Sequence, residues 1–443
     1  MAFDTEHESF WRPDNSAVFT AAVSDRSGPF IFRLSCEMSE TVNADALNTA
    51  LPRASKRFPY LFVRLRKGVF WHYFEPCSAL IETERERTVP CRQEAGDESM
   101  RLCRVYARGR SIACEFHHAI TDGTGGMIFL RALIIEYLTA LGVPLDRERN
   151  RLLDFIDREA EPEEEEWEDS YRKHFRRDIP PPDKVPKAWL LPGARMRSDY
   201  RVTTAEMPLD DALEIARKHR VSLTEWLTAC YLAAMQETYL AEGALHSKIR
   251  MSGKRITVQV PINLRKMYPS RTMRNFFLFA APNIDMRLGK WDFPDILERV
   301  HHQMKLGMTK MELYRQLRRN VGGELNPLGR GVFLPLKNFA LRIMNRKLNL
   351  ALYSGSLSNL TAVRLSDDAA AHVKRFHFFP PSNLATGANV GVLSWKDRLC
   401  VTVGSTIADN RIERAFFGFL ARQGLALRVD SSGEAAHHPE RRR

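Results

Sequence analysis

Hydrophobic residues in the first 160 positions follow two different periods. Several short runs are apolar throughout or alternate with polar residues, which is typical of strands. Longer segments repeat apolar residues every three or four positions, which is typical of helices that pack by one face. The predicted strands are 30–38, 60–66, 69–74 and a pair within 102–116 that turns at Gly109. The predicted helices are 43–58, after Asn43 and before Pro59, and 126–141, before Gly142.

The same two periods return in the second half of the chain. The predicted helices there are 209–219, 223–239, 294–307, 334–352 and 412–424. The predicted strands are 255–260, 373–379, 387–395 and 398–405. Strands that alternate with helices over both halves predict an α/β protein.

The two patterned halves are separated by a stretch of different composition. It holds a run of glutamates followed by several prolines, which we interpret as solvent-exposed acidic chain and a stiff connector. We therefore predict an N-terminal half at 1–160, a linker at 161–195, a C-terminal half at 196–428 and a disordered tail at 429–443.

Composition narrows the class of protein. The chain has 443 residues, of which 44% are hydrophobic and 27% charged, which is ordinary for a soluble globular protein of two or three domains. Its seven cysteines are scattered, with no CxxC pair and no close Cys/His cluster, so we expect free thiols and no metal site. No secretory signal and no apolar run of spanning length is visible, so we expect a cytoplasmic protein without an integral membrane span.

The net charge of +12 predicts an anionic partner. A nucleic acid, a membrane surface and a phosphate-bearing cofactor all carry that charge. Because no nucleic-acid-binding module accompanies the basic residues, we expect no nucleic-acid partner. Residues 334–352 mix basic and apolar positions, so they form either an ordinary packed helix or one that touches a membrane, which leaves peripheral association open.

Candidate chemistry lies at residues 117–123, which read His-His-Ala-Ile-Thr-Asp-Gly between a predicted strand and a predicted helix. Loops at strand ends are rigidly held and open to solvent, so α/β proteins often place reactive groups there. A neutral imidazole has a pKa of about 6.5 and can accept a proton at neutral pH. The alternative is a pair of histidines without chemistry beside a helix cap made by Asp122 or Thr121.

This HHxxxDG pattern resembles the active-site motif of the coenzyme-A-dependent acyltransferase superfamily, which includes chloramphenicol acetyltransferase, alcohol acetyltransferases and the condensation domains of peptide synthetases. The resemblance implies an α/β fold of two chloramphenicol-acetyltransferase-like domains, each a mixed sheet packed by helices, with the active site in the channel between them. It implies that His118 is the general base and that His117 positions or packs. It also implies that Asp122 is a buried carboxylate paired with an arginine, and that Gly123 allows a close approach or an unusual backbone angle.

Two further phrases support the resemblance. Residues 261–265 read Pro-Ile-Asn-Leu-Arg, followed by Asn275-Phe276, and resemble a motif of the alcohol acetyltransferase and wax synthase branch. We predict that Arg265 pairs with Asp122 across the domain interface; the alternative is a surface arginine after a strand. Ser358 and Asn359 resemble a segment near the acyl site, where they would donate hydrogen bonds to the developing oxyanion; the alternative is a polar turn.

The implied reaction is transfer of an acyl group from acyl-coenzyme A to an alcohol, with an amine as the next acceptor class. One alternative is a free-standing condensation-type enzyme whose donor is a thioester on an acyl carrier protein. Another is a non-catalytic binding protein of the same fold. Large two-domain members of this superfamily usually act as monomers, so we expect a monomer that uses acyl-coenzyme A as co-substrate and no metal ion.

Overall fold

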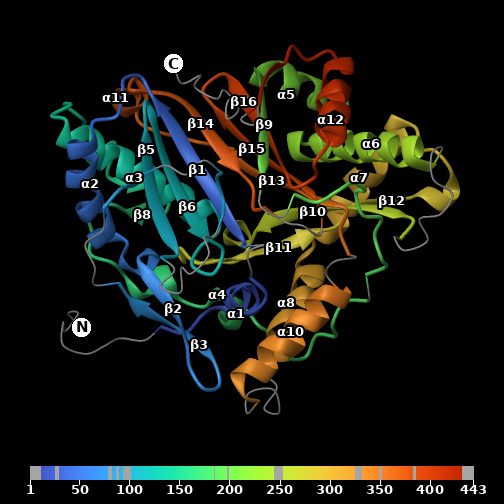
Figure 1. Ribbon diagram of the computed structural model, residues 1–443, viewed down its shortest axis with the longest axis horizontal. Helices are drawn as coiled ribbons and strands as arrows, with labels where there is room; N and C mark the ends of the chain where they lie inside the picture. Colours follow the sequence, from blue (N-terminus) through green and yellow to red (C-terminus); the bar gives the residue numbers. More distant parts are fainter. Residues whose placement is uncertain are drawn as a thin grey trace, which may run out of the picture.

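The computed structural model describes residues 11–24, 29–77, 82–85, 89–92, 101–183, 185–196, 199–243, 253–324, 332–348, 352–382 and 386–431. Two large mixed sheets, each covered by helices, form two lobes that lie beside one another (Figure 1). The predicted fold class is confirmed.

The first lobe is built on a five-stranded sheet in the order β14-β1-β6-β5-β4. Its strands are β1 (Ile31–Met38), β4 (Glu84–Arg85), β5 (Cys103–Arg108), β6 (Ser111–His117) and β14 (Val373–Phe379). All pairs are antiparallel except β4 with β5, so the sheet is mixed. Helices α2 (Ala44–Arg57) and α3 (Gly123–Ala140) pack on it through fully buried side chains such as Leu47 and Phe129.

The second lobe is built on a longer sheet in the order β11-β10-β13-β15-β16-β9-β17, with β12 paired to β10. Its strands are β9 (Arg201–Pro208), β10 (Arg255–Asn263), β11 (Phe277–Ala280), β12 (Asn283–Asp285), β13 (Gly355–Ala362), β15 (Ala388–Trp395), β16 (Arg398–Ser405) and β17 (Arg428–Ser431). Its helices are α5 (Leu209–Lys218), α6 (Leu223–Gly243), α7 (Phe293–Gly307) and α12 (Arg411–Arg422).

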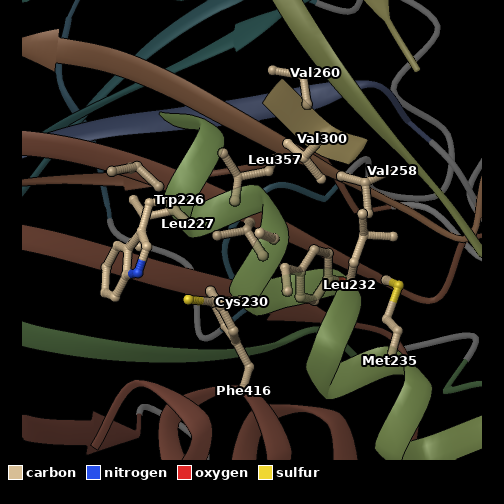
Figure 2. Close-up of a cluster of buried hydrophobic side chains, with 14 of the residues drawn as sticks. Trp226, Leu227, Cys230, Leu232, Met235, Val258, Val260, Val300, Leu357 and Phe416 are labelled. Atoms are coloured by element: carbon tan, nitrogen blue, oxygen red, sulfur yellow. The ribbon is translucent and has the colours of Figure 1, made fainter. Parts of the chain in front are cut away.

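Helix α6 lies at the centre of the second core. Figure 2 shows Trp226 and Cys230 of this helix among side chains of the sheet and of α12, including Leu357 and Phe416. These residues are all fully buried. Burying large apolar side chains contributes on the order of 1.5–3 kcal/mol each. Residues 226–235 of this helix are apolar except for Thr228, which explains its interior position.

A third group of elements lies together along one side of both lobes (Figure 1). It comprises the hairpin of β2 (Val63–Lys67) and β3 (His72–Pro76) with helices α1 (Asn15–Val23), α8 (Lys310–Glu324) and α10 (Leu334–Leu348). Shorter elements are α4 (Ser170–Lys173), α11 (Asp367–Ala370), β7 (Leu152–Leu153), β8 (Ile156–Asp157) and the 3-10 helices η1 (Pro59–Leu61), η2 (Glu164–Trp167), η3 (Leu264–Lys266) and η4 (Met286–Leu288). In the described part of the chain, no helix combines the length and the apolar character that crossing a bilayer requires.

The structure differs from the sequence prediction in the acidic stretch. Glu166, which we expected in exposed chain, is fully buried and binds Arg57 through two hydrogen bonds of 2.7 and 2.8 Å. The hydroxyl of Tyr60 donates a third, of 2.6 Å. A buried carboxylate is tolerated only when such donors surround it, and no local sequence pattern announces partners about a hundred positions away.

Two other differences concern the C-terminal region. Strand β14 pairs with β1 in the first sheet, so the second half of the chain supplies an edge strand to the first lobe. Residues 428–431, part of which we expected to be disordered, form β17 along β9. Pairing satisfies the backbone of β9 at the edge of its sheet, a tertiary effect that this short polar segment does not reveal by itself. The rest of the predicted tail lies outside the described residues, and the predicted domain limits stay a prediction.

Candidate active site

The HHxxxDG segment lies at the seam between the two lobes. Strand β6 ends at His117, and α3 begins at Gly123 with Asp122 as its N-cap. Residues 263–276 of the second lobe contact the loop between them through several hydrogen bonds. Thr121 donates to the carbonyl of Met273 at 2.6 Å, and the Asn263 amide donates to Thr124 at 3.1 Å. The loop shape therefore depends on both halves of the chain.

His117 is fully enclosed, with both ring nitrogens engaged. Its Nδ1 accepts the backbone N–H of Ala119 at 3.0 Å, which requires the proton to be on Nε2. That Nε2 lies 3.2 Å from the Ser24 hydroxyl, and Ser24 itself donates to the carbonyl of Pro29. Burial, together with the neighbouring His118, lowers the pKa of His117 to about 3. This neutral ring shapes the turn and has no nitrogen left for proton transfer.

His118 is partly exposed, and Asn275 fixes its tautomer. The Asn275 Nδ2 group donates to the carbonyl of His118 at 2.7 Å and faces a carboxylate oxygen of Asp14 at 3.4 Å. Because the carbonyl of His118 can only accept a hydrogen bond, the amide nitrogen must point toward it. The Asn275 Oδ1 atom then faces His118 Nδ1 at 3.3 Å and accepts a hydrogen bond from its N–H group, so Nε2 is the basic nitrogen.

The environment of the His118 ring keeps it neutral. Phe32 and Phe277 flank it, with ring centroids 4.8 and 5.8 Å from the imidazole centroid. Burial lowers the pKa of His118 below 6.5, while the hydrogen bond to Asn275 and the charge of Asp122 act in the opposite direction. A neutral imidazole at pH 7 is the form that a general base requires.

Asp122 is buried and accepts hydrogen bonds on both carboxylate oxygens. Its Oδ1 atom caps α3 by accepting the backbone N–H groups of Thr124 and Gly125 at 3.1 and 3.2 Å. Its Oδ2 atom accepts the backbone N–H of Phe276 at 3.0 Å and lies 2.8 Å from Arg265 Nη1. The expected partner of Asp122 is thus next to it, and only 5% of the Arg265 side chain is exposed.

Arg265 connects this carboxylate to the backbone of its own lobe. Its Nε atom donates to the carbonyl of Thr272 at 2.9 Å, and its Nη2 atom donates to the carbonyl of Arg274 at 2.5 Å. A planar guanidinium can reach three acceptors at once, which the point charge of a lysine cannot do. Arg265 therefore holds the chain immediately before Asn275 against the loop that carries His118.

Glycine at the start of α3 permits close packing across the seam. A Cβ on Gly123 would lie 2.3 Å from a methyl group of Leu360, so the expected close approach is present. The tighter restriction is at Gly125, where a Cβ would lie 2.4 Å from the carbonyl oxygen of Met273. A methyl group of Leu360 can move aside, but a backbone carbonyl cannot do so cheaply.

A cavity of about 1610 Å³ lies at the seam, and His118 is part of its lining. Both lobes contribute, with Phe32 and Met127 from the first and Ser358 and Asn359 from the second. The Asn359 amide donates to the hydroxyl of Thr224 at 3.0 Å and accepts the backbone N–H of Thr361 at 2.8 Å. Ser358 and Asn359 are placed on the wall of the cavity that holds His118, and their role toward an oxyanion stays a prediction.

The sequence did not single out Asn275, which contacts His118, or Asp14, which contacts Asn275. Asn275 appeared only as part of a family phrase, and Asp14 did not appear at all. Asp14 caps α1, is 1% exposed and has its pKa raised to about 7 by burial, with a smaller contribution from Asp169. No local signal connects positions 14, 118 and 275. Among the described residues, no cluster of His, Cys, Asp and Glu is arranged to hold a metal ion.

Comparison with known proteins identifies the class of fold. No protein-family model and no curated protein sequence matches the chain. Among solved structures, polyketide synthase associated protein 5 from Mycobacterium tuberculosis is similar at a TM-score of 0.58 and 14% identity, covering 94% of this chain and 98% of that one. TRI101 of F. sporotrichioides, complexed with coenzyme A and T-2, is similar at 0.60 and 10%, covering 96% and 100%. The condensation domain of the monacolin K polyketide synthase MokA is similar at 0.55 and 10%, covering 94% and 96%.

The chain therefore has the two-lobed fold shared by condensation domains and coenzyme-A-dependent acyltransferases of the chloramphenicol acetyltransferase type. At these identities the likeness establishes the fold.

Proposed function

We propose that this protein transfers an acyl group from acyl-coenzyme A to the hydroxyl of a small-molecule acceptor, with His118 as the general base. The observation that carries the proposal is the state of the His118 ring. Its Nδ1 proton is held by Asn275, its pKa lies below 6.5, and it lines a cavity that both lobes form.

The proposed reaction begins when Nε2 of His118 accepts the acceptor's hydroxyl proton and that oxygen attacks the thioester carbonyl. The carbonyl oxygen becomes an oxyanion, for which Ser358 and Asn359 are the proposed donors. When the carbon–sulfur bond breaks, the sulfur leaves as a thiolate and takes the proton from the imidazolium. The products are an ester and coenzyme A, and His118 returns to its starting state. The hydrogen bond from Nδ1 to Asn275 persists throughout and favours the transient imidazolium.

Coenzyme A as the donor is supported by the charge of the cavity. Basic side chains outnumber acidic ones in its lining, and they include Arg12, Lys187 and Lys266. Such a lining favours a ligand that carries several phosphates. TRI101, whose fold is similar, has been solved with coenzyme A and T-2 together. A hydroxyl acceptor is favoured over an amine because at neutral pH most amines are protonated and lack the lone pair that must attack.

A donor carried by an acyl carrier protein is the second candidate, favoured by the similarity to the MokA condensation domain. The same histidine would serve both donors. Turnover with free acyl-coenzyme A would distinguish the first candidate from the second. A non-catalytic binding role is the third reading, and it predicts that neither donor is consumed.

The test is a thiol-release assay with the purified full chain. Acyl-coenzyme A donors of short, medium and long chain length are combined with alcohols and amines, and products are identified by mass spectrometry. Ester formation with at least one pair, absent from His118→Ala, is the expected result. Release of thiol only from an acylated carrier protein would transfer the assignment to the condensation-type reaction. Turnover that is equal in His118→Ala would overturn the proposed role of the base.

A further inference from the structure

The tip of the β2–β3 hairpin exposes three large apolar side chains in a row. Val69, Phe70 and Trp71 are 60%, 40% and 56% exposed. Hairpin tips normally carry small polar residues, because turns favour them. The exposure of these side chains to water is unfavourable, and a second surface that covered them would remove this cost.

Helix α10 exposes a second apolar set on one of its faces. Leu336, Phe339 and Ile343 follow one another at helical spacing and are 61%, 62% and 39% exposed. Phe333, directly before the helix, is 55% exposed. The opposite side of the helix is turned inward, where Asn338 and Leu341 line the cavity.

The hairpin tip and α10 are joined into one surface. The backbone N–H of Leu334 donates to the carbonyl of Val69 at 2.9 Å, and the Lys337 ammonium donates to the carbonyl of Phe70 at 2.9 Å. Both elements lie at the same edge of the molecule (Figure 1). We call this the hairpin–helix surface; its exposed apolar members are Val69, Phe70, Trp71, Phe333, Leu336, Phe339 and Ile343.

This concentration of apolar side chains is specific to one place. All the exposed phenylalanines and tryptophans among the described residues belong to the hairpin–helix surface. Monomeric soluble proteins seldom gather such residues in one patch unless the patch binds something. Aromatic rings are also the side chains that settle best at the boundary between water and hydrocarbon.

The charge of the two elements selects among the partners that could cover the surface. The sequence of α10 holds four basic residues and no acidic one. Residues 63–76 of the hairpin hold three basic residues and one acidic one. A second copy of the chain would bring two elements of the same net positive charge together and would be repelled. An anionic lipid surface complements both the charge and the apolar side chains.

We propose that the hairpin–helix surface docks the protein onto an anionic lipid bilayer. Phe70 and Trp71 also line the cavity that contains His118, so the docked face borders the cavity. A lipophilic alcohol dissolved in the bilayer would then enter the cavity without crossing water. The entry of an acceptor rests on the proposed function, whereas docking does not.

The test is co-sedimentation of the full chain with vesicles. Vesicles of phosphatidylcholine alone are compared with vesicles that also contain phosphatidylglycerol. The Leu336→Gln/Phe339→Gln variant removes two apolar members that do not line the cavity. The matched control is Leu288→Gln/Val429→Thr, at residues that are 73% and 48% exposed on other elements.

We expect the wild-type chain and the control to sediment with the anionic vesicles, and the helix variant to bind at least about tenfold more weakly. Equal binding by the helix variant and the wild type would overturn the proposal. Absence of wild-type binding to anionic vesicles would overturn it as well. A third outcome would also overturn it: light scattering shows a dimer of the wild-type chain, the helix variant is monomeric, and neither protein binds vesicles. The surface would then join two copies of the chain.

The helix variant is also assayed for thiol release with a water-soluble acceptor, where we expect wild-type turnover. If neither protein turns over but vesicle binding differs as expected, the proposed function fails and the docking surface stands.

Discussion

Replacing Arg265 by glutamine tests how far the active-site loop depends on the pair that spans the seam. In the wild-type protein the guanidinium binds Asp122 and two backbone carbonyls, and almost none of it is exposed. Glutamine leaves a buried carboxylate with backbone donors alone and removes the donors to Thr272 and Arg274. Removing one partner of a buried ion pair costs about 3–5 kcal/mol.

That cost predicts the size of the thermal effect. Unfolding entropy is about 2.1 cal/mol/K per residue, which for a chain of 443 residues amounts to about 0.9 kcal/mol/K. If the chain unfolds in one step, the midpoint should fall by about 3–5 °C. If the lobes unfold separately, the fall should be larger, because fewer residues share the loss. Scanning calorimetry measures it.

The effect on turnover should exceed the effect on stability. Arg265 holds the segment that carries Asn275, and Asn275 orients His118, so the variant should misplace the base. A shift of about 1 Å in a reacting group can reduce the rate about 100-fold. The matched control is Arg201→Gln, which breaks the partly buried pair of Arg201 with Glu413 in the second lobe, 2.7 Å apart. The control should lower the midpoint but keep kcat. An Arg265→Gln protein that loses stability and keeps kcat would refute the positioning argument.

Three further predictions concern residues around the cavity. For the wild-type chain, kcat/KM should rise with pH and level off, with the midpoint of the rise below pH 6.5, because the neutral form of His118 is active. Asn275→Leu should lower the plateau about 100-fold and move the midpoint to lower pH, since Asn275 raises the pKa of His118. An unchanged midpoint would contradict this role of Asn275. Burial raises the pKa of Asp14 to about 7, so the stability that its protonated form contributes is present below pH 3.8 and is lost as the pH rises through 7. Asp14→Asn should therefore raise the melting temperature more at pH 8 than at pH 5. An equal rise at both pH values would count against a buried charge at this position. Asn359→Ala should reduce kcat about 100-fold if its amide serves the oxyanion, and unchanged turnover would remove Asn359 from the mechanism.

Sequence periodicity predicted several of the elements that pack by one regular face. The predicted helix at 43–58 corresponds to α2, and its cap at Asn43 accepts the backbone N–H of Ala46. The turn at Gly109 has a positive φ of 56°, which is the reason for a glycine there. Helix α8 was not predicted, although Leu313, Leu317 and Val321 recur at helical spacing and are fully buried.

The candidate site was predictable only in its local part. A strand end followed by a capped helix places His118 and Asp122 on one loop, and this follows from neighbouring residues. The tautomer of His118 depends on Asn275, which lies 157 positions away, and the Nε2 atom of His117 faces the hydroxyl of Ser24, 93 positions earlier. These contacts join segments far apart in the chain, and they leave no repeating pattern in a single sequence. The same holds for β14, whose place in the first sheet is set by pairing with β1.

The central claim is that the imidazole of His118 removes a proton during acyl transfer. Ester formation from acyl-coenzyme A is therefore compared between the wild-type chain, His118→Ala and the control His302→Ala, whose ring is largely exposed on α7. General-base catalysis contributes about 10²- to 10⁴-fold, so His118→Ala should lose at least about 100-fold in kcat, with an unchanged melting temperature. The His302→Ala control should retain wild-type turnover. A folded His118→Ala protein that forms ester at the wild-type rate would contradict the account.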